Sequence, residues 1–299
     1  MTRTKAWVEA IRPRTLPLSL AGILFGSASA FKNGFTDWQL FIFAISTTLL
    51  FQILSNLAND YGDGVKGTDN QDRVGPTRAV QSGVISHKEM KNAVIFTAVL
   101  SIISATVLIY FGTRNMSNYV LFTYIGLAIF CIIAAITYTV GKKAYGYNGL
   151  GDIMVFIFFG LVSVLGVYSL YAKSFDVLNI LPAISIGLLS VAVLNLNNMR
   201  DFASDKKAGK NTFVVKIGVN NAKIYHFFTI IIAIVTLFFF LVESELIISF
   251  ISLLPCIALL FHLMKVAKVK TTKEFDPELK VVALSTFFIS LLYFCSVLF

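Results

Sequence analysis

Two pairs of aspartates stand out in a chain that is otherwise mainly apolar. Asp60 and Asp63 form the first pair and Asp201 and Asp205 the second, and within each pair the residues are one helical turn apart, so both carboxylates can share a face. Carboxylate oxygens that face a wet cavity suit Mg2+, which takes one or two protein carboxylates together with waters and phosphate oxygens. The two pairs therefore predict a site for divalent cations that is built from two halves.

Asparagines accompany both aspartate pairs. The polar positions 56, 59, 60 and 63 follow the spacing i, i+3, i+4 and i+7, so a continuous helix would align them as one stripe. The Asn-x3-Asp pattern of 56–60 recurs at 197–201, and this weak internal repeat also occurs in transporters, so by itself it does not select a function. The asparagines concerned are Asn56, Asn59, Asn197 and Asn198.

Basic residues lie close to both aspartate pairs. Acids that can hold metal ions, mixed with bases that attract anions, indicate a diphosphate site rather than a simple cation site. Interfacial polar residues or solvated ion pairs would explain one such cluster equally well, but two matching clusters favour a functional site because charge at a membrane helix is costly. The bases are Arg73, Arg78, Arg200, Lys206, Lys207 and Lys210.

The remaining reactive residues carry weaker signals. Asp152 follows a Gly-Leu-Gly sequence and either takes part in the site or caps the next helix. The three histidines are scattered along the chain and form no catalytic motif with Ser, Cys or Asp. The three cysteines lie singly in apolar runs, with neither metal-ligand spacing nor a disulfide framework.

The elements that must position these residues are membrane helices. With 57% hydrophobic residues, 14% charged residues and a mean hydropathy of +0.78, this all-α chain is predicted to be a polytopic membrane protein. Nine apolar runs are long enough to span a bilayer and to form a bundle around a central cavity. They cover roughly 15–31, 38–60, 90–111, 119–140, 152–172, 177–198, 224–242, 246–264 and 281–299.

Charge in the connections predicts the orientation of the bundle. Alternate connections hold 22 Lys and Arg against 3 on the other side, so the N-terminus is expected in the cytoplasm and the C-terminus outside the cell membrane. The net charge of +9 is thereby a topology signal, and nucleic acid is not an expected partner. The expected cytoplasmic loops 61–89, 141–151 and 199–223 hold the motifs, and the long first and third loops indicate function. A capping box at Ser86–Glu89 predicts a helix start there.

Three segments together resemble a known family. They are LSNLANDYGDGVKGTDNQDRVGPTRAVQSGVIS (54–86), YTVGKKAYGYNGLGDIMVFIFFG (138–160) and NLNNMRDFASDKKAGKNTFVVKIG (195–218). They resemble the UbiA-type intramembrane prenyltransferases, and the extension GTD...DRVGPTRAV favours the branch that uses 1,4-dihydroxy-2-naphthoate. The resemblance covers nearly the whole chain and implies one domain over 1–299 with a nine-helix bundle.

The resemblance also implies roles for single residues. The four aspartates would hold two Mg2+ ions on a polyprenyl diphosphate, supported by the four asparagines. Tyr138 and Lys142 match the family's Tyr-x-x-x-Lys pattern, and Arg14 in RPRTLP is expected to face the cavity. The general pattern would place a third aspartate where this chain has Gly67, and Asp69 is expected to take its place. Contacts to the substrate are expected from Arg73, Arg78, Arg200, Lys206 and Lys210.

The reaction implied by the resemblance is prenyl transfer to the naphthoate ring with loss of CO2 and diphosphate, giving demethylmenaquinone inside the lipid bilayer. Two alternatives stay open at this point. Another aromatic acceptor, such as 4-hydroxybenzoate or homogentisate, would need the same diphosphate site. An ion-coupled transporter would need acids deeper in the spans, whereas these acids lie at helix ends beside bases.

Overall fold

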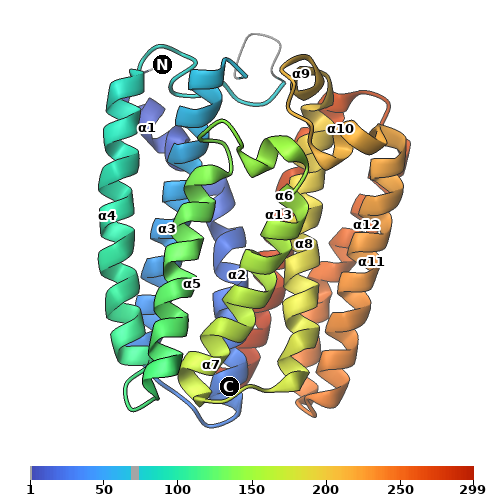
Figure 1. The fold of residues 1–299 in the computed structure, drawn as a ribbon. Coiled ribbons are helices and arrows are strands. Elements are labelled where there is room, and N and C mark those ends of the chain that lie inside the picture. The colour runs from blue at the N-terminus through green and yellow to red at the C-terminus, as the bar shows by residue number, and fades with distance from the viewer. Residues whose placement is uncertain (1, 69–73) are drawn as a thin grey trace.

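The computed structural model describes residues 2–68 and 74–299, and in these ranges the regular structure is entirely helical. The helices form an elongated bundle whose two termini lie at opposite ends, as an odd number of spans requires (Figure 1). The all-α prediction is therefore confirmed. Asp69, Asp72 and Arg73 lie outside the described residues.

In the part of the chain that the structure describes, eight helical stretches are long and apolar enough to cross a membrane. The 17-residue helix α2 (Leu16–Lys32), most of which is buried within the bundle, adds a ninth, and the nine correspond to the nine predicted spans. The eight are α3 (Trp38–Lys66), α4 (His87–Gly112), α5 (Asn118–Thr137), Gly151–Ala172, Val177–Arg200, α11 (Val219–Glu243), Ile247–Lys268 and Thr272–Leu298.

Four of these stretches combine several elements. Gly151–Ala172 joins α6 (Gly151–Val155), a π-helical segment, η3 (Phe156–Gly166), and α7 (Val167–Ala172). Val177–Arg200 contains α8 (Ile180–Arg200), while α12 (Leu254–Lys268) and α13 (Phe275–Leu298) follow short 3-10 turns. Short helices at one end, α1 (Arg3–Ile11), α9 (Phe202–Lys207) and α10 (Phe213–Ile217), mark what we call the loop-rich end, at the top of Figure 1.

The helix boundaries follow local sequence. The predicted capping box is confirmed, because Ser86 Oγ accepts from the Glu89 amide and the Glu89 carboxylate accepts from the Ser86 amide. Helix α3 continues six residues past its predicted end at 60, and Gly67, with a φ of 69°, ends it in the left-handed region that glycine adopts without strain. Asp63, which falls in the expected loop 61–89, therefore lies on the same helix as Asp60.

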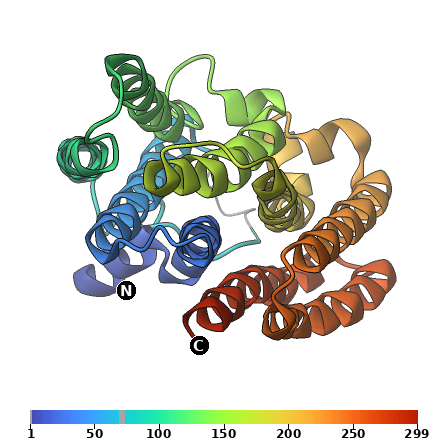
Figure 2. The ribbon, with the colours of Figure 1, turned by 90° about the horizontal axis from the view of Figure 1, so that it is seen from below.

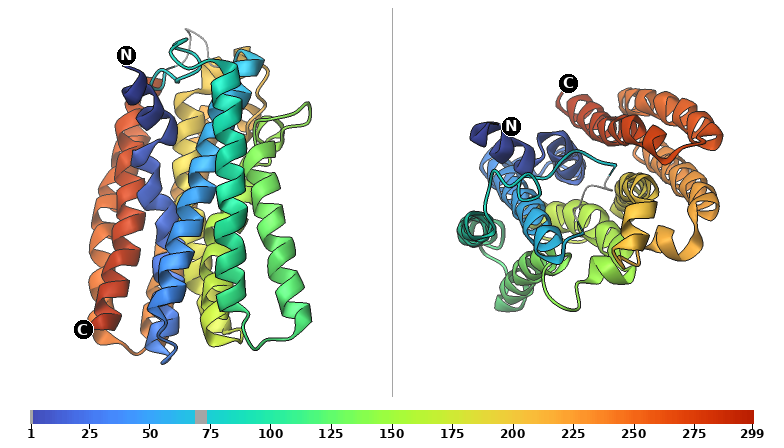
Figure 3. Two further views of the ribbon diagram at one scale, coloured as in Figure 1. Left: turned by 90° about the vertical axis from the view of Figure 1, so that its left-hand side faces the viewer. Right: turned by 90° about the horizontal axis from the view of Figure 1, so that it is seen from above.

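The bundle divides into two packed groups. Helices α11, α12 and α13 gather on one side and α4 and α5 on the other (Figures 2 and 3), and α3 packs on α4 while α13 packs on α2 and α8. The larger apolar core includes Phe25 of α2, which stacks on Tyr293 of α13 with ring centroids 4.2 Å apart. A smaller core joins α1, α3 and α4. Between the two groups, the loop-rich end carries the acids and bases of the two aspartate motifs.

Candidate active site

A cavity of about 370 Å3 extends from the loop-rich end into the bundle between α2, α3, α5, η3 and α8. Its mouth is lined by polar and charged side chains, whereas its deeper walls are mainly apolar. The residues at the mouth are Arg12, Asn56, Asn59, Asp63, Arg78, Tyr138, Asn197, Asn198 and Lys210. The deeper walls include Phe51, Leu108, Ile109, Leu127, Phe158, Phe159 and Leu170. Such a division suits a ligand with an anionic head and an apolar tail.

Asp63 is the first-motif carboxylate at the cavity. Its Oδ1 accepts a hydrogen bond of 2.7 Å from the hydroxyl of Tyr147, and its Oδ2 lies 3.5 Å from the ammonium of Lys210. The backbone amide of Lys210 in turn donates to the carbonyl of Asp205, over 2.8 Å. Lys210 thus joins the two aspartate motifs, which lie about 140 positions apart in the chain.

Asp60 has a different environment from Asp63. It is fully buried, and its two carboxylate oxygens accept from the backbone amides of Ala79 and Val80 at 3.1 and 3.2 Å. It fastens the far end of the first long loop to α3, and it is not among the cavity-lining residues. Each carboxylate oxygen has a second lone pair, so its predicted role as a metal ligand stays a prediction.

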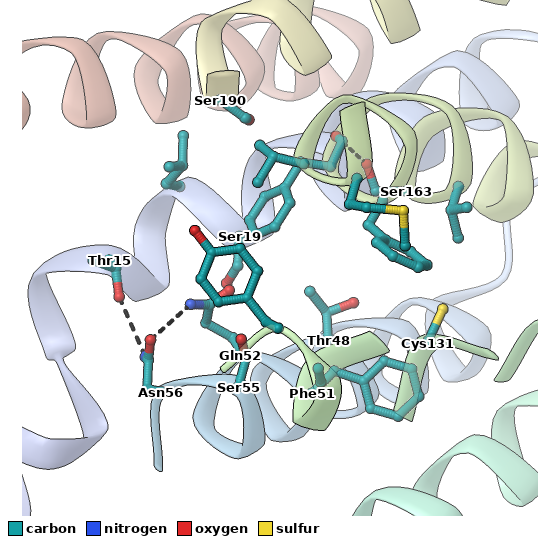
Figure 4. A pocket seen from close by; sticks show the side chains of 18 of the residues that line it. Thr15, Ser19, Thr48, Phe51, Gln52, Ser55, Asn56, Cys131, Ser163 and Ser190 are labelled. Atoms are coloured by element: carbon teal, nitrogen blue, oxygen red, sulfur yellow. Dashed lines mark hydrogen bonds between the residues drawn. The ribbon is translucent and has the colours of Figure 1, made fainter. Parts of the chain in front are cut away.

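Asn56 fixes an elbow between α1 and α2. Its amide nitrogen donates to the carbonyl of Ile11 at 2.8 Å and to the hydroxyl of Thr15 at 3.4 Å, while its oxygen accepts from Gln52 (Figure 4). Between Ile11 and Thr15 lies Arg12, whose φ of 57° is a left-handed conformation that a non-glycine residue adopts only when neighbours hold it there. This elbow brings Arg12 to the cavity.

Arg14 was expected at the cavity and does not line it. The left-handed turn at Arg12 rotates the following 3-10 turn, η1 (Pro13–Thr15), so that Arg14 is exposed and Arg12 takes the place beside the site. Lys142 of the Tyr-x-x-x-Lys pattern is likewise exposed and does not line the cavity, whereas Tyr138 does. Lys206 is exposed on α9.

The second aspartate motif is held by Arg200. The Arg200 guanidinium donates to both carboxylate oxygens of Asp201, at 2.9 and 2.7 Å, to the Asn197 side chain at 2.8 Å, and to Asp276 of α13 at 2.6 Å. Arg200 does not line the cavity, although contact with the substrate was expected of it. The carboxylate of Asp205 lies one turn further along, in α9, and is also buried.

The loop between α5 and α6 brings a third wall to the site. At Gly62 of α3 an added Cβ would lie 2.9 Å from the backbone of Thr139, so glycine permits this loop to contact the helix. The Thr139 hydroxyl donates to the Asn59 side chain at 3.1 Å. Tyr147, from the same loop, carries the hydroxyl that binds Asp63, and burial together with the Asp63 charge raises the pKa of Tyr147. Its hydroxyl therefore stays protonated and donates.

The donor set fits Mg2+. The carboxylates of Asp63 in α3, Asp201 at the junction of α8 and α9, and Asp205 in α9 are all nearly buried. Asp63 lines the cavity together with the four asparagines, whereas Asp201 and Asp205 are not among its lining residues. Within residues 2–68 and 74–299, no three acidic, histidine or cysteine side chains converge as a complete metal cage. A hard cation that takes one or two protein carboxylates and draws its other ligands from phosphate oxygens matches this arrangement.

Several residues at the site were not singled out from sequence. Tyr147 was noted only as part of a Tyr- and Gly-rich loop, and Arg12 was passed over for its neighbour Arg14. Thr68 shares a hydrogen bond of 2.5 Å with the Tyr147 hydroxyl, and Asp276 binds Arg200 from a helix 76 residues away. Spacing along one helix can reveal the aspartate motifs, but none of these partners lies on the same helix as the residue it holds.

Comparison with known proteins assigns the class. The model of the UbiA prenyltransferase family matches residues 19–292, and the chain belongs to this family. A 1,4-dihydroxy-2-naphthoate octaprenyltransferase from Escherichia coli (strain K12) is 50% identical over 226 residues, which are 76% of this chain and 73% of that protein. The family and the nine-helix architecture expected from the sequence are thereby confirmed.

Two solved structures share the fold. The apo structure of a UbiA homologue from Aeropyrum pernix K1 superposes with a TM-score of 0.69 at 14% identity, over 95% of this chain and 96% of that one. A UbiA homologue from Archaeoglobus fulgidus bound to DMAPP and Mg2+ gives a TM-score of 0.59 at 16% identity, over 98% and 99% of the two chains. At these identities the likeness concerns the fold.

Proposed function

We propose that this protein transfers a polyprenyl group from polyprenyl diphosphate to 1,4-dihydroxy-2-naphthoate, releasing diphosphate and CO2 and giving demethylmenaquinol, the reduced form of demethylmenaquinone. The observation that carries the proposal is the cavity with acids and bases at its mouth and apolar walls below. It is supported by the 50% identity over 226 residues to a protein named 1,4-dihydroxy-2-naphthoate octaprenyltransferase. An amphiphilic donor with a diphosphate head and an isoprenoid tail matches that division of polarity.

The head of the donor would lie among the charges at the mouth. Arg12, Arg78 and Lys210 line this end of the cavity and offer cationic donors to phosphate oxygens. We propose two Mg2+ ions, held by Asp63, Asp205, Asp201 and Asp60; when bound, they neutralise charge on the departing diphosphate as Lewis acids. These carboxylates are buried, so the surrounding side chains hold them in place, and Tyr147 and Lys210 orient Asp63.

The tail would follow the apolar walls towards the opposite end of the bundle. Side chains such as Phe51, Phe158 and Leu170 exclude water from this part of the cavity. Exclusion of water matters because an allylic carbon that loses its diphosphate is trapped by any water that reaches it. Product and tail can leave sideways into the lipid, since the substrate is itself a lipid.

The acceptor would complete the reaction next to the diphosphate. A bond forms between the first carbon of the prenyl group and the ring carbon that bears the carboxylate, while the bond from the prenyl carbon to diphosphate breaks. The bond from the ring to its carboxylate then breaks, its electron pair returns to the ring, and CO2 leaves. Cations at the mouth also suit an acceptor that is an anion.

The organisation around this site is part of the proposal. We propose one catalytic unit over 1–299, with its N-terminus and the three motif-bearing loops in the cytoplasm and its C-terminus outside. The asymmetry of Lys and Arg between alternate connections supports this orientation. Cysteine substitutions at Lys142 and at Asn115, in the connection at the opposite end of the bundle, would test it by their labelling with an impermeant thiol reagent from each side.

An acceptor competition tests the substrate. Purified protein is given Mg2+, octaprenyl diphosphate and equal amounts of 1,4-dihydroxy-2-naphthoate, 4-hydroxybenzoate and homogentisate, and the products are identified by mass. We expect only the decarboxylated prenyl naphthoquinol. A prenylated hydroxybenzoate or homogentisate as the main product would contradict the acceptor, and absence of diphosphate release with every acceptor would contradict prenyl transfer.

A further inference from the structure

We propose that Asp276, at the beginning of α13, is a positioning residue for the second aspartate motif: it holds Arg200, so that Arg200 orients Asp201 without cancelling its charge towards Mg2+. The inference rests on the proposed function, because it concerns how strongly that site binds its metal. Neither Asp276 nor α13 belongs to either aspartate motif, and its contact with Arg200 joins the last helix of the bundle to the site.

The contacts of Arg200 use nearly all of the N–H donors of its guanidinium group. Its Nε and one Nη2 hydrogen go to the two oxygens of Asp201, its other Nη2 hydrogen goes to Asn197, and Nη1 donates to Asp276. The Arg200 side chain is 3% exposed and that of Asp201 7%, so this pair is held away from water. A guanidinium committed in this way has few donors left for a substrate.

Arg200 also orients the side chain of Asn197. It lines the cavity, and its side-chain oxygen is fixed by the Arg200 hydrogen bond of 2.8 Å. Arg200 therefore orients two polar residues of the motif at once, Asn197 one turn before it and Asp201 directly after it. A rigid planar fork can do this, whereas a lysine, with a single ammonium, cannot hold both in a fixed geometry.

The charge of Arg200 is the reason why Asp276 is needed. A guanidinium bound to Asp201 alone would form a neutral pair, and a neutral pair attracts a cation weakly. With Asp276 on the other side of the guanidinium, at 2.6 Å, the three side chains together keep one negative charge. A carboxylate oxygen can accept from more than one partner, so the hydrogen bonds from Arg200 do not by themselves prevent Asp201 from binding a cation.

A simpler role for Asp276 makes a different prediction. Asp276 lies in the first turn of α13, where an acidic side chain stabilises the helix by its interaction with the helix dipole. In that case its loss would lower the stability of the protein but leave the dependence on Mg2+ unchanged. The Asp276 side chain is 40% exposed, so its replacement leaves no deeply buried vacancy, and the two roles can be separated.

The test measures metal dependence without turnover. Wild-type protein and variants in detergent are mixed with a thiolo analogue of geranyl diphosphate, which does not react, and the rise in melting temperature is followed as Mg2+ is added. We expect Asp276→Asn to need about tenfold more Mg2+ for half of the effect, because outer partners of metal ligands typically contribute 10- to 100-fold. Asp276→Glu, which keeps the charge, should stay close to wild type.

A matched control lies two residues earlier. Glu274 carries the same charge at the same end of the helix, and its side chain accepts hydrogen bonds from Thr271 in its own turn, so Glu274→Gln should titrate like wild type. An Asp276→Asn variant with an unchanged Mg2+ midpoint, or a shift equal to that of Glu274→Gln, overturns the inference. If the Asn variant does not fold, Asp276→Ala is measured in its place with the same criteria. No Mg2+-dependent stabilisation of the wild type would instead contradict the proposed function itself.

Discussion

The hydroxyl of Tyr147 offers a sharp test of how the three loops build one site. Tyr147→Phe removes a single oxygen, which donates to Asp63 over 2.7 Å and shares a hydrogen bond with Thr68 over 2.5 Å. The ring, which lies beneath the ammonium of Lys66 at 3.9 Å, is kept. The change therefore removes the orientation of Asp63 and leaves the packing and the charge of the site in place.

The size of the effect follows from the charge and the exposure of the contact. A hydrogen bond to a charged group contributes about 1.5–3 kcal/mol, and each ~1.4 kcal/mol corresponds to about tenfold in rate. Tyr147 is only half-buried, so the lower end of that range applies. We expect kcat/KM for the polyprenyl diphosphate to fall about tenfold at saturating acceptor, with little change in melting temperature.

The assay is release of diphosphate by purified protein, with a second tyrosine as the control. The Tyr168 hydroxyl accepts a hydrogen bond from Asn33 at the opposite end of the bundle, so Tyr168→Phe removes the same single oxygen and a neutral hydrogen bond away from the site. It should keep wild-type kinetics. Activity of Tyr147→Phe within twofold of wild type, or an equal loss in Tyr168→Phe, would refute the idea that Tyr147 orients a functional carboxylate.

The dependence on pH gives a second readout of the same residue. Burial and the neighbouring Asp63 raise the pKa of Tyr147. The hydroxyl therefore stays protonated at every pH below the ordinary tyrosine pKa of ~10, and also just above it. The ratio of wild-type to Tyr147→Phe activity should therefore be constant between about pH 7 and about pH 9. A ratio that falls towards one across this range would mean that the tyrosine loses its proton there.

Three other changes test separate parts of the site. Asp63→Asn should lower prenyl transfer at least ~100-fold at an unchanged melting temperature, because Asp63 is a proposed metal ligand and a direct ligand contributes more than an outer partner; product measured by mass at a near-normal rate would contradict this. Lys210→Met should raise the KM for the diphosphate about tenfold, since a charged hydrogen-bond donor at the mouth is lost; an unchanged KM would exclude that contact. Asn56→Ala leaves the Ile11 carbonyl without its donor and should lower the free energy of unfolding by about 1–3 kcal/mol in a denaturant titration.

The helices and the aspartate motifs were accessible from sequence for a physical reason. A membrane span must be apolar over its whole length, so the nine spans are visible as runs, and residues one turn apart on a helix must share a face. The alignment of Asn59 and Asp63 at the cavity follows from that periodicity alone. Their neighbour Asp60 shows its limit, because the amides of Ala79 and Val80 that bind it come from a loop whose path no spacing predicts.

Contacts between distant segments could not be predicted in the same way. Arg12 rather than Arg14 lines the cavity because the backbone at Arg12 is left-handed. Asn56 stabilises this turn through its hydrogen bond to the Ile11 carbonyl, which joins residues 45 positions apart. His226 and His262, which look scattered in the sequence, meet with their Nε2 atoms 2.8 Å apart, and Glu278 binds His262 at 2.5 Å. Such groups become neighbours only when the order of the helices around the bundle is known.

The balance of products tests prenyl transfer to the naphthoate most directly. Purified protein with Mg2+ and octaprenyl diphosphate is given 1,4-dihydroxy-2-naphthoate that carries an isotopic label in its carboxyl group, and diphosphate, labelled CO2 and prenylated ring are measured together. We expect the three to appear in equal amounts and to stop together when Mg2+ is chelated. A prenylated product that keeps the label, or labelled CO2 without diphosphate, would contradict the proposed reaction.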